Sequence, residues 1–216
     1  MFRDRVDAGR RLAVELARFR DESPCVLALP RGGVPVAVEI ATALNAPLDL
    51  VLVRKIGAPD QPELALGAVV DGSRPEVVLN REIVDLLEVP EAYISRESAR
   101  QLQEIERRRA LYLADRPRVD IAGRTALIVD DGIATGATIR AAILATRRAQ
   151  PKRLILAVPV APKDTLAALR KEADEVVCLE AYEEFGAIGL YYADFTQVSD
   201  DEVRHLMAQA ARPAAA

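Results

Sequence analysis

Short apolar runs alternate with amphipathic stretches along most of the chain. Runs that are almost wholly apolar occupy 25–29, 48–53, 125–129, 153–158 and 175–179, and stretches with helical periodicity occupy 3–21, 33–44, 136–148 and 163–172. A short run that is apolar on both faces is typical of a strand buried on both sides. The alternation therefore predicts an α/β fold, in which a Rossmann-like parallel sheet is flanked by helices.

One segment interrupts this alternation. The runs 65–70 and 76–79 flank Asp71–Pro75, which is rich in turn-forming residues and predicts a hairpin. A helical pattern follows over 81–113, with a break expected at Pro90. We interpret residues 64–115 as an insertion in a single domain of residues 1–216, because no repeat and no long linker divides the chain.

Composition and charge narrow the function classes. The net charge of −4 comes from mixed signs, so no nucleic-acid surface is expected. The run Arg107–Arg109 follows Glu104 and Glu106, and its simplest interpretation is a solvated helix face. Two cysteines in apolar runs fit a reducing compartment, and a charged N-terminus with no long apolar run argues against a signal peptide or membrane span. A soluble, cytoplasmic protein is expected.

Ligands of open parallel sheets gather at the carboxyl ends of the strands. Three segments, 30–35, 54–63 and 130–138, follow predicted strands and contain turn-forming and polar residues. We expect the functional site to lie among these three segments.

The segment 130–138 has the most specific chemistry. Asp130 and Asp131 end a predicted strand, and a loop of small residues then opens a helix near Gly136. Small side chains let backbone N–H groups approach an anion, which the start of a helix also attracts. Thr135 and Thr138 could donate hydroxyl hydrogen bonds, while the two carboxylates suit sugar hydroxyls or Mg²⁺. A phosphorylated ribose combines these features.

Other interpretations of this segment are weaker. A strand–turn–helix junction with a capping Asp is the purely structural alternative. A Walker A loop needs a Gly-Lys pair, which the chain lacks, and no Gly-x-Gly-x-x-Gly dinucleotide fingerprint is present.

The segment 126–138, Ala-Leu-Ile-Val-Asp-Asp-Gly-Ile-Ala-Thr-Gly-Ala-Thr, resembles the signature of the type I phosphoribosyltransferases. The resemblance implies binding of 5-phosphoribosyl-1-pyrophosphate (PRPP) with Mg²⁺ as cofactor. Asp130 and Asp131 would be the catalytic carboxylates and would hold the metal. The loop for the 5′-phosphate would be Gly132, Ile133, Ala134, Thr135, Gly136, Ala137 and Thr138.

Two further segments resemble pyrophosphate-binding parts of this family. Arg31, Gly32 and Gly33 follow the first predicted strand and match an Arg-Gly-Gly form of the pyrophosphate loop. The polar segment 54–63 resembles the corresponding stretch of a bacterial subgroup of this family. Arg54 and Lys55 open this segment and would contact the same pyrophosphate group, although a solvated strand end is the alternative. Residues 64–115 would replace the flap that other members close over PRPP.

The C-terminal segment 181–200 resembles the small hood of purine-salvage members. By that resemblance Phe185 or Tyr192 would stack on a base, and Asp194 would assist Mg²⁺. Packing roles for these aromatic residues are the alternative. The single histidine, His205, lies in a terminal amphipathic stretch and is expected at the surface.

The implied reaction is attack of a nitrogen acceptor, such as a nucleobase, on PRPP with release of pyrophosphate. Enzymes for 6-oxopurines carry an acid where this chain has Ala134, so a hypoxanthine–guanine specificity is not expected. A non-catalytic PRPP or nucleotide-binding regulator of the same fold, and an enzyme for another sugar phosphate, remain alternatives. The family also implies a homodimer; the acceptor and the pathway stay open.

Overall fold

A computed structural model describes residues 1–71, 75–114 and 116–210 of the chain. The helices and strands are, in order, α1 (Arg5–Leu16), a 3-10 helix η1 (Ala17–Glu22), β1 (Cys25–Ala28), α2 (Gly33–Leu44), β2 (Leu48–Leu50), β3 (Val53–Ala58), β4 (Gln61–Val70), β5 (Glu76–Leu79), α3 (Arg81–Leu86), α4 (Glu91–Leu113), β6 (Thr125–Val129), α5 (Ala137–Arg148), β7 (Arg153–Pro162), α6 (Lys163–Leu169), β8 (Glu175–Tyr182), a second 3-10 helix η2 (Ile188–Tyr191) and α7 (Asp200–Ala210).

Five strands form a parallel sheet in the order β2-β1-β6-β7-β8. Alternate residues of its strands enter two hydrophobic cores, as Leu127 and Ile128 of β6 illustrate. The core that contains Leu127 also receives α1, α2 and α7, and the core that contains Ile128 receives α5 and α6. The predicted α/β fold with a parallel sheet covered on both faces is confirmed.

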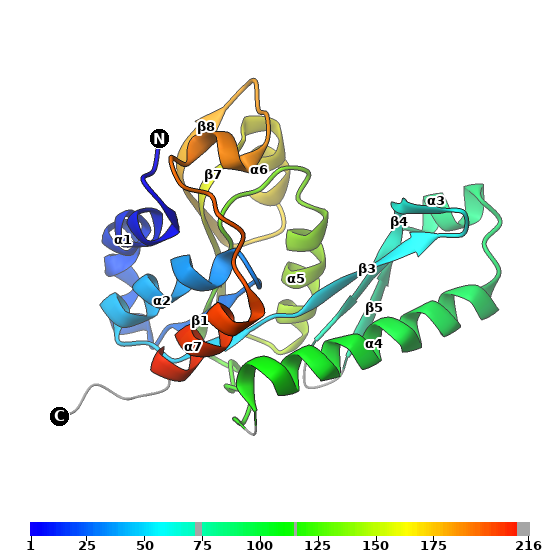
Figure 1. Ribbon diagram of the computed structural model, residues 1–216, viewed down its shortest axis with the longest axis horizontal. Helices are drawn as coiled ribbons and strands as arrows, with labels where there is room; N and C mark the ends of the chain where they lie inside the picture. The colour runs from blue at the N-terminus through cyan, green and yellow to red at the C-terminus, as the bar shows by residue number, and fades with distance from the viewer. Residues whose placement is uncertain (72–74, 115, 211–216) are drawn as a thin grey trace.

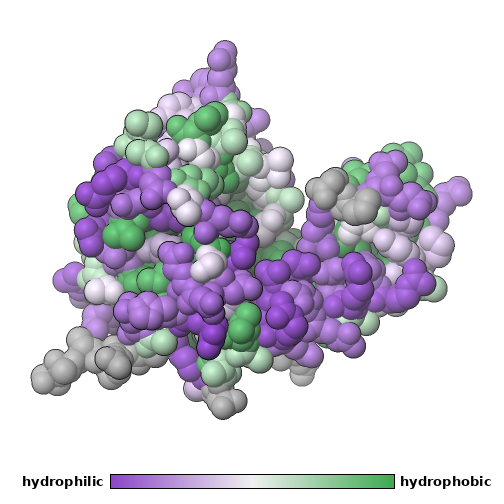
Figure 2. Space-filling model, in the orientation of Figure 1, coloured by the Kyte–Doolittle hydropathy of each residue, from purple (hydrophilic) through white to green (hydrophobic). Residues whose placement is uncertain are grey.

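A second sheet, β3-β4-β5, is antiparallel. Together with α3 and α4 it forms a projection that we call the arm, which extends from one side of the parallel sheet (Figure 1). The predicted pairing of 65–70 with 76–79 and the helix break before Glu91 are confirmed, although residues 72–74 of the predicted turn lie outside the described residues. Figure 2 shows a deep notch between the arm and the rest of the molecule.

The prediction of a turn-rich loop over 54–63 is wrong. β2 ends at Leu50, and β3 begins at Val53 and pairs with β4. Ile56 and Ala58 are buried in this pairing, so the segment follows the two-residue period of a strand. The Gly, Pro and charged residues of the segment made this period hard to recognise in the sequence. The inserted element therefore begins about ten residues earlier than position 64 suggested, as the bounds of β3 show.

Membrane insertion through a helix finds no support in the described part of the chain, where none of the helices is both long and apolar enough to cross a bilayer.

Candidate functional site

Two adjacent carboxylates lie at the carboxyl end of β6, in the middle of the parallel sheet. Asp131 is 8% exposed and Asp130 is half-buried. The backbone N–H of Asp131 donates to Asp130 Oδ1 over 2.9 Å, so the two side chains share one turn. Burial, together with the negative charge of Asp131, raises the pKa of Asp130 well above the usual Asp range. The pair carries more negative charge than its surroundings neutralise.

Asp131 is held from several directions. Arg5 Nε donates to Asp131 Oδ2 over 2.7 Å, and both side chains are 11% exposed. The hydroxyl of Tyr192 donates to the backbone oxygen of Asp131 over 2.6 Å. Burial raises the pKa of Asp131, and Arg5 opposes that shift. Arg5 is a site residue that the sequence did not reveal.

The loop after the acid pair forms an uncapped helix N-terminus. Gly136 precedes α5 with φ of 77°, a left-handed conformation that favours glycine, and no side chain caps the helix there. Thr135, Ala137 and Thr138 are exposed around this turn, whereas Ile133 is buried. The first N–H groups of a helix have no partners within the helix and attract anions. The backbone N–H groups at this turn are therefore not occupied by a capping side chain, and binding of an anion there stays a prediction.

Ala134 and Gly132 connect this loop to its neighbours. Thr165 Oγ1 donates to the backbone oxygen of Ala134 over 3.2 Å. A Cβ on Gly132 would lie 2.6 Å from Cγ2 of Ile188, so the hood segment packs directly on the loop. The segment 132–138 and the hood segment therefore meet at one edge of the sheet.

The Arg31–Gly33 segment lies beside the acid pair, because β1 and β6 are neighbours. A Cβ on Gly32 would overlap Asp131 Oδ2, so only glycine allows this approach. The Pro30–Arg31 peptide bond is cis. Arg31 and Gly32 line a cavity of about 360 Å³ with Arg5, Asp131, Phe195, Gln197 and Val198. The structure thus brings two of the three predicted loops together.

Arg31 also reaches a contact outside this cavity. Its Nη1 lies 3.4 Å from Asp200 Oδ1, at the start of α7. The hydroxyl of Tyr112 donates to the same carboxylate oxygen over 2.6 Å and lowers the pKa of Asp200.

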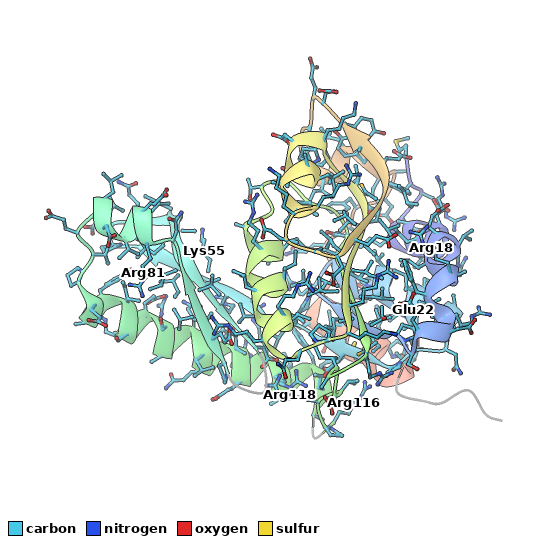
Figure 3. The ribbon with its side chains drawn as sticks, turned by 180° about the vertical axis from the view of Figure 1, so that it is seen from behind. Arg18, Glu22, Lys55, Arg81, Arg116 and Arg118 are labelled. Carbon is cyan, nitrogen blue, oxygen red and sulfur yellow. The ribbon has the colours of Figure 1, made fainter. Side chains whose placement is uncertain are left out.

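Arg54 and Lys55 lie on β3 of the arm and face different neighbours. Arg54 Nε donates to Gln101 Oε1 of α4 over 3.0 Å. Lys55 instead extends toward α5 (Figure 3) and lines a cavity of about 490 Å³ that also includes Ala137 and Thr138. The structure therefore places Lys55 beside the phosphate loop and Arg54 on the face of the sheet that α4 covers.

The aromatic residues of the hood pack mainly on one another. Tyr192 is 5% exposed, and its ring centroid lies 5.4 Å from that of Phe2 and 5.0 Å from that of Phe195. Phe185 stacks on Tyr191 with centroids 4.8 Å apart and stays partly exposed. Tyr192 therefore has a packing role in this structure, as the alternative interpretation proposed.

Asp194 does not join the acid pair. It is exposed and accepts hydrogen bonds from the backbone N–H and the hydroxyl of Thr196, which lower its pKa. Among the described residues, no group of three or more His, Cys, Asp or Glu side chains is placed to hold a metal ion. The predicted metal role of Asp130, Asp131 and Asp194 stays a prediction.

The three arginines of α4 do not form one solvated face. Arg107 and Arg108 donate to Glu104 at the surface. Arg109 is only 13% exposed and forms ion pairs with Asp49 (3.2 Å) and Asp71 (2.8 Å), so the interpretation as a solvated face is wrong for this residue. The signal was present in the sequence, since Arg109 lies four residues after Ile105 and three before Tyr112 on the buried stripe of α4.

Similarity to known proteins agrees with this geometry. A profile of the phosphoribosyl transferase domain matches residues 3–196. A Mycobacterium tuberculosis H37Rv protein with the curated name "Putative phosphoribosyl transferase" is 48% identical over 204 residues, which are 94% of this chain and 45% of that protein. The chain thus spans less than half the length of the curated relatives it matches, which include the same protein of strain CDC 1551.

Solved structures support the fold. The crystal structure of TT1426 from Thermus thermophilus has a TM-score of 0.85 and 43% identity, over 98% of this chain and 100% of that chain. The AQ2163 protein from Aquifex aeolicus has a TM-score of 0.51 at 11% identity, over 84% of this chain and 74% of that chain, and shares the fold alone. The resemblance found in the sequence is confirmed: the chain belongs to the phosphoribosyl transferase domain family.

Proposed function

We propose that this protein transfers the 5-phosphoribosyl group of PRPP to a nitrogen acceptor and releases pyrophosphate, with Mg²⁺ as cofactor. The observation that carries the proposal is the uncapped N-terminus of α5, which a five-residue loop connects to two adjacent carboxylates, Asp130 half-buried and Asp131 buried. The helix N-terminus would bind the phosphate and the two carboxylates would bind the ribose, so one phosphorylated ribose would occupy both parts of the site. Membership of the family supports the same reaction.

The loop 132–138 would hold the 5′-phosphate through backbone N–H groups and the hydroxyls of Thr135 and Thr138. The helix N-terminus contributes about 0.3–1 kcal/mol to anion binding at an exposed site, and hydrogen bonds to a charged group add about 1.5–3 kcal/mol each. Gly136 keeps the turn open for this approach because its φ is 77°. Phosphate binding would fix the ribose over Asp130 and Asp131.

The acid pair suits a divalent cation bound together with a substrate. Mg²⁺ prefers one or two carboxylates and completes its shell with phosphate oxygens and water. Asp130 fits this pattern, because its charge is opposed chiefly by burial and by Asp131, which together outweigh the attraction of Arg5. When bound with PRPP, Mg²⁺ would neutralise charge that develops on the leaving pyrophosphate.

Pyrophosphate would lie over Arg31, Gly32 and Gly33, where the approach of Gly32 to Asp131 keeps the loop against the acid pair. Lys55 would add a positive charge from the arm, since it shares a cavity with Thr138. Arg54 would contribute only after the arm changes its position, because it now contacts Gln101. These groups position the donor and stabilise charge, which is the main requirement of a displacement with a cationic transition state.

The acceptor would enter beneath the hood. Phe185 is the stronger of the two predicted stacking residues, since it is partly exposed whereas Tyr192 is buried. Ala134 offers no carboxylate to accept a proton from a 6-oxopurine. We therefore expect adenine-like or other nitrogen acceptors to react and guanine to react poorly.

The test measures pyrophosphate release from PRPP and Mg²⁺ with a panel of nitrogen bases, after a thermal-shift screen for PRPP binding. A ligand at 100 times its Kd stabilises the folded state by about 2.7 kcal/mol, which such a screen detects. Base-dependent pyrophosphate release would support the enzyme. PRPP binding without release under any base would favour the PRPP-binding regulator, and absence of PRPP binding would contradict both. Efficient guanine turnover would contradict the role assigned to Ala134.

A further inference from the structure

Arg5 is a charged residue on the buried stripe of α1. The helix buries Ala8, Gly9, Leu12, Ala13 and Leu16. Arg5 lies three residues before Ala8 and four before Gly9, so it continues this stripe by one turn. A long cationic side chain rarely occupies such a position unless it has partners.

The partners of Arg5 lie in three directions. Its Nε donates to Asp131 Oδ2 over 2.7 Å, and its Nη1 donates to the backbone oxygen of Thr196 over 2.8 Å. The guanidinium carbon lies 3.9 Å from the ring centroid of Phe195. A planar, forked guanidinium can satisfy these contacts together, whereas a lysine ammonium has neither the fork nor the flat face.

The N-terminal segment that carries Arg5 is itself fixed to the hood. Phe2 N–H donates to Tyr191 O, and Ala193 N–H donates to Phe2 O, each over 2.8 Å. Asp4 caps α1 by accepting from the N–H of Asp7 over 2.7 Å. The start of α1, the hood and the acid pair therefore form one closed set of contacts, with Arg5 at its centre.

We propose that Arg5 is a positioning residue of the phosphoribosyl donor site, which acts through Asp131; this inference rests on the proposed function. The ion pair orients the Asp131 carboxylate against Gly32. Without the guanidinium, a carboxylate side chain that is 11% exposed would lose its cationic partner beside a second carboxylate. It would turn, and the ribose and metal end of the site would lose its geometry.

The test compares three variants with the wild type. Arg5→Met removes the charge and keeps the length, and Arg5→Lys keeps the charge but loses the fork. Arg10→Met is the matched control, because Arg10 lies on the same helix, is 63% exposed and pairs with Glu39 at the surface. Thermal unfolding of each variant reports whether the fold is intact, and Kd for PRPP with Mg²⁺ is measured by calorimetry.

Loss of groups that orient ligating residues lowers affinity or activity by about 10–100-fold. We expect Arg5→Met to raise Kd by that factor, Arg5→Lys to raise it several-fold, and Arg10→Met to leave it unchanged. If Arg5→Met does not fold, the increase for Arg5→Lys relative to Arg10→Met decides the question. Equal Kd values for the wild type and the folded Arg5 variants would overturn the inference.

A double-mutant cycle separates positioning from direct contact, since Arg5 also lines the cavity shared with Arg31. In an Asp131→Asn background, the carboxylate through which Arg5 acts is absent. Adding Arg5→Lys should therefore change the Kd for PRPP less than twofold. A further loss equal to that in the wild-type background would mean that Arg5 contacts the donor itself and would overturn the positioning role. If the wild type does not bind PRPP, the proposed function fails; if it binds while the Arg5 variants bind equally, only this inference fails.

Discussion

The protein contains two clusters of buried carboxylates that differ in their balance of charge. Asp49 and Asp71 meet two guanidiniums, those of Arg109 and Arg118, at the base of the arm. The N–H of Val119 also donates to Asp49 Oδ2 over 2.9 Å. Figure 3 shows Arg118 in this region. The charges cancel, and the cluster connects the arm to the parallel sheet.

The acid pair at the end of β6 has the opposite character. Asp130 and Asp131 meet one guanidinium, that of Arg5, and the pKa of Asp130 is raised. We propose that the first cluster is complete without a ligand, whereas the second reaches charge balance when a cation or hydroxyl donors bind. On this proposal the unbalanced carboxylates mark the functional site, and the balanced ones mark a structural contact.

The first way to test this difference is to remove a carboxylate from the balanced cluster. Asp71→Asn should lower the free energy of unfolding by about 3–5 kcal/mol, because Arg109 loses a partner in a buried place. Urea unfolding measures the loss. Glu104→Gln is the control, since that carboxylate pairs with Arg107 and Arg108 at the surface and should contribute little. Equal effects of the two substitutions would show that the buried cluster has no special role.

The matching change in the acid pair should separate stability from activity. Asp130→Asn should lower kcat/KM for PRPP by about 10²–10³-fold, the usual cost of losing one electrostatic group of an active site. The same change should raise the melting temperature, because it removes a charge that burial and Asp131 disfavour. A variant that is both active and less stable than the wild type would contradict the distinction between the two clusters.

Two glycines with left-handed backbones allow a finer test of the anion cradle. Gly136 and Gly123 have φ of 77° and 68°, so an alanine at either position should cost about 1–2 kcal/mol of stability. Only Gly136→Ala should also weaken PRPP binding, because Gly136 lies in the loop that opens α5 and its added Cβ would lie 3.0 Å from Cγ2 of Thr165 in α6. A Cβ added to Gly123 would meet no atom within 4 Å apart from those of its chain neighbours, so Gly123→Ala serves as the control. Unchanged PRPP affinity in Gly136→Ala would contradict the cradle.

The smallest predicted effect is a dependence of stability on pH. Because the pKa of Asp130 is raised, the folded protein keeps this proton to a higher pH than the unfolded chain does. The free energy of unfolding should therefore fall as pH rises from the ordinary Asp pKa, about 4, through the raised value. Urea unfolding of the wild type and Asp130→Asn across this range should show a smaller fall in the variant. Parallel curves would contradict the assignment of the raised pKa to this pair.

Part of the fold and site could be predicted because local patterns determine it. The strands before 130 and 30 are short apolar runs, and the small residues of 132–138 need a cradle-like loop. The position of the arm could not be predicted, since the alternation in β3 is broken by Gly57 and by Arg54, a charged residue on the face that α4 covers. Arg5 was missed because its contact with Asp131 spans 126 positions. A charged residue on a buried helical stripe was the available signal for both Arg5 and Arg109.

The most direct test of the central claim is an amide NMR titration of the wild-type protein with PRPP and Mg²⁺. The account predicts that the largest chemical-shift changes fall on the amides of Asp131 and of Thr135 to Thr138, and that Asp130→Asn strongly reduces them. Saturating PRPP with no change at these amides would contradict the assignment of this loop as the donor site.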